Sequence, residues 1–137
     1  MPIIALVDDE NSIRTSVSLA LESDGFQVDA FNNGEEALAA LETKHYDLGL
    51  FDIKMPKMDG NELLSKVRNS KSETLKKLPV IFLTSKDQEQ DEIIGLRMGA
   101  ADYITKPFSQ KLLNERIRTV LRVYQNRTSQ TNIDDKT

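Results

Sequence analysis

Residues 3–10 read IIALVDDE, five apolar residues that end abruptly at three acids. The run is too short for a helix and rich in β-branched side chains, so it predicts a buried strand. Similar short apolar runs recur along the chain, and each is followed by a stretch whose apolar residues have helical spacing. The predicted strands are Ile3–Val7, Phe26–Ala30, Leu48–Phe51, Val80–Leu83 and Asp102–Thr105.

The stretches between the strands predict five helices. They cover Ile13–Leu21, Gly34–Leu41, Gly60–Val67, Ile93–Arg97 and Leu112–Leu121, with Gly25 and Gly99 placed as left-handed C-terminal caps. The polar stretch Asn69–Leu78 is predicted as a longer loop or a frayed helix end. Five strand–helix units in strict alternation predict an α/β fold, a doubly wound five-stranded parallel sheet with helices on both faces.

Composition restricts the possible functions. The 137 residues carry 18 Lys+Arg against 22 Asp+Glu and no cysteine, which fits one domain and excludes zinc fingers, thiol catalysis and a disulfide scaffold. The net charge of −4 argues against binding nucleic acid through a basic surface. No apolar run is long enough to cross a membrane and the start does not resemble a signal peptide, so we expect a cytoplasmic protein.

The C-terminal residues differ in composition from the rest. Residues 126–137, NRTSQTNIDDKT, contain one apolar side chain and cannot offset the entropy of ordering. We therefore expect a folded domain over residues 1–125 and a flexible tail or truncated linker over residues 126–137.

Reactive side chains follow the predicted strands. In parallel sheets the site lies beyond the carboxyl ends of the strands, where this chain has Asp8, Asp9, Asp52, Thr84 and Lys106. If the first and third strands are neighbours, three carboxylates converge, and pairs about 4 Å apart repel by roughly 4 kcal/mol at an effective dielectric near 20. Such a cluster implies a cation, and oxygen ligands without His or Cys favour Mg²⁺. A carboxylate nucleophile, a metal and donors from Lys106 and Thr84 are what phosphoryl transfer requires.

Four motifs together carry a family resemblance. They are the acidic pair Asp8-Asp9, the run DIKMPKMDG over residues 52–60, Thr84 at a strand end, and YITKPF over residues 103–108. In this order they resemble the receiver domain of bacterial two-component response regulators, over about residues 2–124. The resemblance is closest to receivers of the winged-helix transcription-factor class, and it implies the sheet order 2-1-3-4-5.

The resemblance implies a role for each site residue. Asp52 matches the acceptor of a phosphoryl group from a sensor histidine kinase. Mg²⁺ would be held by Asp9 and Asp52, by Asp8 through water, and by the Lys54 backbone carbonyl. Lys106 would pair with the phosphoryl oxygens, Thr84 and Tyr103 would be the switch residues, and the bond before Pro107 would be cis.

The resemblance also implies an output surface, formed by the helix around Ile93–Arg97, the strand Asp102–Thr105 and the helix Leu112–Leu121. Phosphorylation would favour a homodimer there, and the candidate contacts are Asp102, Arg116, Arg118 and Arg122. Ala101 departs from the pattern, because that class commonly has an acid at this position. No helix-turn-helix pattern follows, so DNA would be reached only through an effector domain outside this chain. We therefore expect the protein to be a signalling switch with self-catalysed phosphoryl transfer and autodephosphorylation, and not an enzyme.

Other functions fit the residues less well. A hydrolase of the haloacid-dehalogenase type usually has a second acid two residues after its nucleophile, where this chain has Lys54. A nucleotide- or flavin-binding domain would have a glycine-rich first turn, whereas VDDENS repels phosphate without a metal. A stand-alone receiver and a phosphate-independent partner-binding module remain alternatives.

Overall fold

The computed structural model describes residues 1–85 and 87–136, with side chains described as far as Gln125. All five predicted strands and all five predicted helices are present, with ends that differ from the prediction mostly by one to three residues. The strands are β1 (Ile3–Val7), β2 (Gln27–Phe31), β3 (Leu48–Asp52), β4 (Val80–Thr84) and β5 (Asp102–Thr105). The helices are α1 (Asn11–Ser23), α2 (Gly34–Thr43), α3 (Gly60–Arg68), α4 (Glu73–Lys76), α5 (Glu89–Arg97) and α6 (Gln110–Lys136).

The strands form one parallel sheet in the order β2-β1-β3-β4-β5, as the resemblance implied. β1 and β3 are neighbours in a register that pairs Val7 with Phe51. Asp8 and Asp52 therefore follow paired residues at the same edge of the sheet. β3 and β4 are buried along their whole length, which explains why their sequences are continuous apolar runs.

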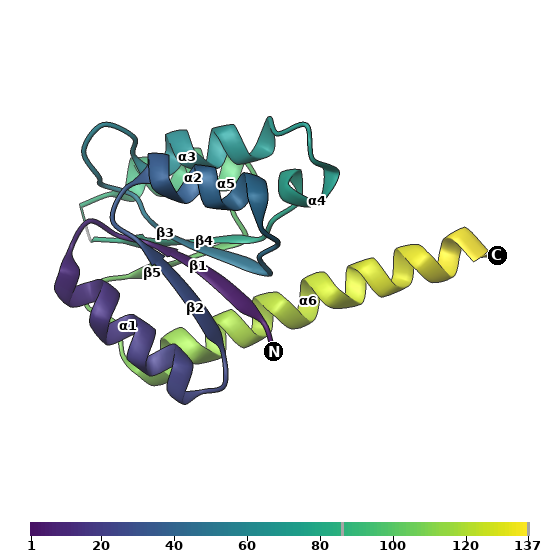
Figure 1. The fold of residues 1–137 in the computed structure, drawn as a ribbon, viewed down its shortest axis with the longest axis horizontal. Helices are drawn as coiled ribbons and strands as arrows, with labels where there is room; N and C mark the ends of the chain where they lie inside the picture. The colour runs from purple at the N-terminus through teal and green to yellow at the C-terminus, as the bar shows by residue number, and fades with distance from the viewer. Residues whose placement is uncertain (86, 137) are drawn as a thin grey trace.

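Helices cover both faces of the sheet, with α1 and α6 on one side and α2, α3, α4 and α5 on the other (Figure 1). Side chains alternate between the faces along each strand. Leu6, Leu50 and Leu83 pack with α1 and α6, whereas Val7 and Phe82 pack with the opposite layer. This alternation decides which helix layer each functional side chain faces.

The α4 turn is the first difference from the sequence prediction. Residues 69–78 were expected as a loop or a frayed helix end, but they contain a separate helical turn. Ser72 caps it by accepting a hydrogen bond from the Leu75 amide at 3.2 Å. Leu75 and Leu78 are buried in the core, which fixes this turn against the domain.

The second difference is the length of α6. The predicted helix ended at Leu121, whereas the backbone of α6 stays helical to Lys136; the expected flexible tail or truncated linker over residues 126–137 stays a prediction. The chain has no Gly or Pro after Pro107, so nothing stops a helix that has already been nucleated by its packed first part. The side chains of residues 126–136 lie outside the described part, and the domain boundary at residue 125 stays a prediction. Among the described residues, no helix is long and apolar enough to cross a membrane.

Candidate functional site

Three carboxylates meet at the carboxyl ends of β1 and β3. Oxygen atoms of Asp8, Asp9 and Asp52 all lie within 4.8 Å of one another. Asp8 is fully buried and Asp52 is 5% exposed, while Asp9 faces solvent. We call these three residues the acidic pocket. The convergence that was predicted from the strand ends is therefore present.

Lys106 supplies the positive charge of the acidic pocket. Its ammonium donates to Oδ2 of Asp8 at 3.0 Å and to Oδ1 of Asp52 at 3.3 Å. The backbone amide of Lys106 also donates to the Thr84 carbonyl at 2.6 Å, which fixes the end of β5 beside β4. The Lys106–Pro107 peptide bond that follows is cis, as expected.

Burial and neighbouring charge control the ionisation of these groups. Burial raises the pKa of Asp52 to about 7, and the Asp8 carboxylate adds to this rise against the lowering effect of Lys106. For Lys106, burial alone lowers the pKa, but the hydrogen bond to Asp8 and the charge of Asp52 outweigh burial and the pKa is raised. One lysine thus leaves the negative charge of the acidic pocket incompletely compensated.

The loop after Asp52 folds back closely on the end of β3. The Gly60 amide donates to the Ile53 carbonyl at 2.8 Å. A Cβ on Gly60 would lie 2.5 Å from the Asp52 carbonyl oxygen, so a side chain there would displace the backbone of Asp52. Lys54 lies in this loop with its side chain paired to Asp91 at 3.3 Å, and the metal-ligand role of its carbonyl remains a prediction.

The two predicted switch residues face the α5 side of the sheet. The buried Thr84 hydroxyl donates to Oε1 of Glu92 on α5 at 2.7 Å. Tyr103 on β5 is 38% exposed, so its ring lies at the surface in this state. Neither side chain shares the contacts of Lys106 with the acidic pocket, and the switching roles stay predictions.

The four residues predicted to form a dimer contact lie in different surroundings. Arg116 pairs with Asp102 of the same chain at 2.9 Å, which joins α6 to β5. Arg118 instead pairs with Asp24 after α1 and with Glu115 at 3.4 Å, so its guanidinium is directed away from β5. Arg122 is exposed on α6.

Two side chains that touch the site were missed by the sequence analysis. Arg14 on α1 donates to the Asp8 carbonyl at 2.7 Å and so holds the turn between β1 and α1. Glu92 receives the Thr84 hydrogen bond. Both are charged residues within predicted or adjoining helical segments, and no motif or spacing in the sequence distinguishes them. Only the orientation of each helix relative to the sheet reveals their contacts.

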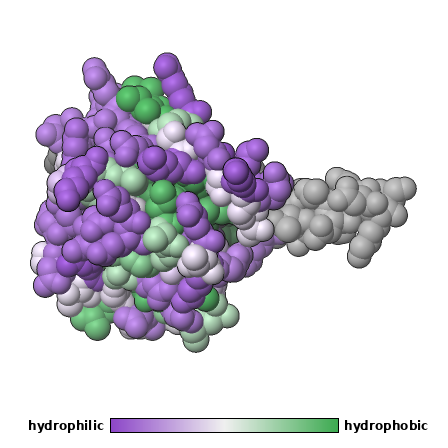
Figure 2. Space-filling view, turned by 45° about the horizontal axis from the view of Figure 1, so that its top comes forward, coloured by the Kyte–Doolittle hydropathy of each residue, from purple (hydrophilic) through white to green (hydrophobic). Residues whose placement is uncertain are grey.

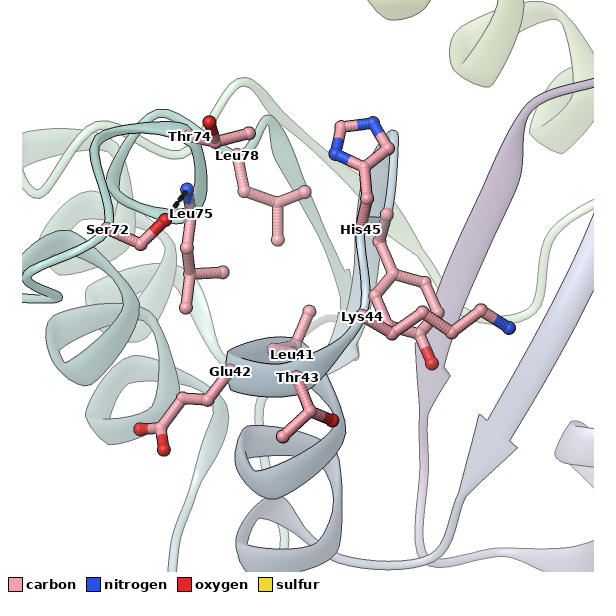
Figure 3. Close-up of a pocket in the computed structure, with 10 residues that line it drawn as sticks. Leu41, Glu42, Thr43, Lys44, His45, Ser72, Thr74, Leu75 and Leu78 are labelled. Carbon is pink, nitrogen blue, oxygen red and sulfur yellow. Dashed lines mark hydrogen bonds between the residues drawn. The ribbon is translucent and has the colours of Figure 1, made fainter.

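A separate cavity of about 280 Å³ lies at the opposite edge of the sheet, before the starts of β3 and β4. Leu41, Leu75 and Leu78 line its apolar part, with Lys44, His45 and Ser72 among the polar residues around it (Figure 3). It contains no residue of the acidic pocket. The residues expected to carry the phosphoryl chemistry therefore lie outside this cavity.

The acidic pocket has the donor set of a hard cation site. Three carboxylates close together, two of them buried, could bind a metal ion, and oxygen-only ligands suit a small divalent cation. Burial and the Asp8 charge raise the pKa of Asp52, and a further positive charge beside its carboxylate would offset both effects. The residues present therefore fit the expected metal.

Comparison with known proteins agrees with the geometry. Residues 4–118 match the response regulator receiver domain family. The alkaline phosphatase synthesis transcriptional regulatory protein PhoP of Bacillus subtilis is 43% identical over 119 residues, which cover 87% of this chain and 48% of that protein. The transcriptional regulatory protein PcoR of Escherichia coli is 40% identical over 119 residues, covering 87% of this chain and 51% of that protein. The chain thus spans about half the length of the curated relatives it matches.

Solved structures share the same fold. A CheY-like response regulator receiver domain protein from Methanospirillum hungatei has a TM-score of 0.85 at 31% identity, covering 93% of this chain and 98% of that one. A chemotaxis protein of Vibrio cholerae has a TM-score of 0.81 at 32% identity, covering 88% of this chain and 98% of that one. Sequence match, sheet order and acidic pocket agree, and the chain belongs to the response regulator receiver domain family, a family of signalling modules and not of enzymes.

Proposed function

We propose that this domain is a phosphorylation-controlled switch that accepts a phosphoryl group on Asp52 from a phosphohistidine of a sensor histidine kinase. The observation that carries the proposal is the position of Asp52, whose buried carboxylate lies beside Asp8 and accepts a hydrogen bond from Lys106 at 3.3 Å. A plain structural carboxylate would not require a second buried acid next to it. The cytoplasm, where such kinases present their phosphohistidine, is the expected location.

The proposed step is a direct displacement at phosphorus. A carboxylate oxygen of Asp52 attacks, the bond from phosphorus to the imidazole nitrogen breaks, and an acyl phosphate forms on Asp52. The pKa of about 7 leaves about half of Asp52 ionised at neutral pH, and a bound cation would favour the ionised, nucleophilic form. Lys106 is placed to move its hydrogen bond from the Asp52 carboxylate to the phosphoryl oxygens while it keeps its contact with Asp8. Later attack by water on the acyl phosphate releases inorganic phosphate and restores Asp52.

Mg²⁺ is the proposed cofactor. Asp9 and Asp52 would hold it directly, Asp8 through water, and the Lys54 carbonyl would complete the protein ligands. When bound, the ion would offset the charge of the carboxylates and of the transferred group. Asp8 also keeps its contact with Lys106 in this scheme, so it positions the lysine as well as the ion.

The proposed output is a change at an apolar surface next to the switch residues. We call Ile93, Ile94, Leu96, Tyr103 and Leu112 the output face; each is between 38% and 48% exposed, and they lie on α5, β5 and α6. The surface in view in Figure 2 is largely hydrophilic, with apolar patches between the hydrophilic residues. Exposed large apolar side chains on these three elements would favour association with another protein. We propose a phosphorylation-favoured homodimer through the output face, with transcription controlled by an effector domain outside this chain.

The test is the intact mass of the protein after incubation with acetyl phosphate, with and without Mg²⁺. We expect one added phosphoryl group that requires both Mg²⁺ and Asp52, and no addition to Asp52→Asn. Asp59→Asn serves as the control, because Asp59 is an exposed acid outside the acidic pocket. Addition to Asp52→Asn would overturn the assignment. No addition to the native protein from acetyl phosphate or from a phosphorylated kinase would favour the phosphate-independent binding module.

A further inference from the structure

Glu92 on α5 holds the hydroxyl of Thr84 by a 2.7 Å hydrogen bond. Thr84 is fully buried at the end of β4, while Glu92 is half-buried in the first turn of α5. A charged acceptor at this distance makes a strong hydrogen bond. The bond ties the strand that carries the predicted switch threonine to the helix that carries part of the output face.

A hydroxyl group has a single proton to donate. Thr84 can therefore donate to Glu92 or to a phosphoryl oxygen on Asp52, but not to both. We propose that Glu92 is a positioning residue that competes with the phosphoryl group for the Thr84 hydroxyl and so holds the domain in its unphosphorylated state. This inference rests on the proposed function of Asp52.

The packing of α5 makes such competition effective. Gly95 is the one residue of α5 that is buried, while Ile93, Ile94 and Leu96 are exposed. Besides the Thr84 bond, polar contacts from this helix run through Asp91, which pairs with Lys54 at 3.3 Å and accepts from Asn61 at 3.3 Å. A helix with so little buried apolar surface depends strongly on individual polar contacts. Loss of the Glu92 bond would release the first turn of α5 on the side facing the acidic pocket.

The proposal gives Glu92 a defined effect on analogue binding. Removing a competitor for the Thr84 proton strengthens binding of any phosphoryl-like group at Asp52. A hydrogen bond to a charged group is strong enough for about a tenfold change in an equilibrium constant. The gain must vanish when Thr84 lacks its hydroxyl, because no proton is then left to compete for.

The experiment is a double-mutant cycle with beryllium fluoride and Mg²⁺, an analogue of the phosphoryl group. Glu92→Ala should bind the analogue about tenfold more tightly than the native protein, and Glu92→Ala in a Thr84→Ala background should bind no better than Thr84→Ala alone. Glu92→Gln should restore part of the native behaviour, since its amide oxygen still accepts. Glu89→Ala, which removes an exposed acid of the same turn, is the matched control and should bind like the native protein.

Two results would overturn the proposal. An equal gain for Glu92→Ala in the presence and absence of the Thr84 hydroxyl would assign the effect to charge repulsion alone. Analogue binding by Glu92→Ala that matches the native protein would remove the effect altogether.

Hydrogen exchange of residues 89–97 without any analogue separates this inference from the proposed function. Glu92→Ala should exchange its α5 amides faster than the native protein and Glu89→Ala. If the native protein takes up no phosphoryl group or analogue, the proposed function fails, and the exchange rates still decide whether Glu92 holds α5. Unchanged exchange in Glu92→Ala contradicts the role of Glu92.

Discussion

The ammonium of Lys106 donates to Oδ2 of Asp8 at 3.0 Å, joining the end of β5 to the end of β1 across 98 residues of sequence. β4 and β3 separate these two strands in the sheet, so the lysine must reach across the carboxyl edge. It also touches Asp52 on the way, at 3.3 Å. Lys106 is therefore the side chain that connects the acidic pocket to the strand of the output face.

Replacing Lys106 tests that connection. In Lys106→Ala, Asp52 keeps its other neighbours, so we expect reduced but measurable phosphorylation by acetyl phosphate. The phosphoryl group would then lack its contact to β5, and phosphorylation should no longer promote dimerisation. Light scattering with and without acetyl phosphate measures this, with Lys66→Ala as a control on the exposed surface of α3. Phosphorylation-driven dimerisation at the native level in Lys106→Ala would contradict the coupling role.

The raised pKa of Asp52 predicts a pH-dependent effect on stability. The folded pKa of about 7 lies above the unfolded value near 3.9, so the folded state binds the extra proton between these values. Asp52 therefore contributes to the stability of the folded state below about pH 4, and this contribution is lost as the pH rises through 7. At pH 8 without metal, the free energy of unfolding of Asp52→Asn should therefore be higher than that of the native protein by roughly 1–3 kcal/mol. This difference in free energy should become smaller towards pH 5. Urea unfolding at both pH values measures it, and a destabilised variant at pH 8 would be inconsistent with an uncompensated buried charge.

Metal binding should stabilise the fold through the same charges. A ligand present at 100 times its Kd stabilises the folded state by about 2.7 kcal/mol, so Mg²⁺ should raise the Tm measurably. Asp9→Asn should lose most of this increase, because Asp9 is an exposed proposed ligand and its replacement disturbs little packing. Glu42→Gln, an exposed acid at the far edge of the sheet, should respond like the native protein. An equal Mg²⁺ response in Asp9→Asn would remove it from the ligand set.

The strands were accessible from the sequence because their apolar runs are short, separate and each followed by a helical pattern, whereas their order was implied by the family resemblance. The acidic pocket was accessible for a related reason. Asp8, Asp52 and Lys106 directly follow or end strands, and strands of a parallel sheet end at the same edge. The alternation of side chains along β4 also places Thr84 on the side of Phe82 and α5, away from the layer that Leu83 faces.

Other features could not be predicted, because they depend on how helices are oriented against the sheet. The Glu92 contact with Thr84 requires α5 to present its first turn to the end of β4, and no periodicity specifies that rotation. The α4 turn is too short for a periodic pattern, and only its burial of Leu75 reveals it. α6 extends beyond the predicted helix 112–121, because a nucleated helix continues until a residue stops it and an apolar pattern does not mark that point.

An ion pair at the edge strand β2 predicts a second pH effect. The Lys44 ammonium and the Tyr46 hydroxyl donate to Oδ2 of Asp29 at 2.7 Å and 2.6 Å, and these contacts hold the pKa of Asp29 below its usual value. A lowered folded pKa gives stability that is present above about pH 4 and is lost as the pH falls through the folded value. Asp29→Asn should cost less than about 1 kcal/mol at pH 7, since both partners are partly exposed and screened by solvent. The difference from the native protein in urea unfolding should diminish from pH 5 towards pH 2, and a difference that grows with acid would contradict the assignment.

Arg68 ties together the segment that leads into β4 and the segment that leads into β5. Its guanidinium donates to the carbonyls of Lys76 at 3.2 Å, Leu78 at 2.8 Å and Gly99 at 2.8 Å. A lysine cannot reproduce this planar set of donors, so Arg68→Lys should lower the free energy of unfolding by about 1–3 kcal/mol. Arg97→Lys, on the exposed side of α5, should cost much less. Equal unfolding midpoints in urea for the two variants would show that the carbonyl contacts contribute little.

The central claim is that Asp52 itself carries the phosphoryl group. Borohydride reduces an aspartyl phosphate to homoserine, so treatment after incubation with acetyl phosphate and Mg²⁺ leaves a stable mark that peptide sequencing by mass spectrometry can locate. The account predicts homoserine at position 52 and unmodified Asp8, Asp9 and Asp59. Homoserine at any of these other positions, with Asp52 intact, would contradict it.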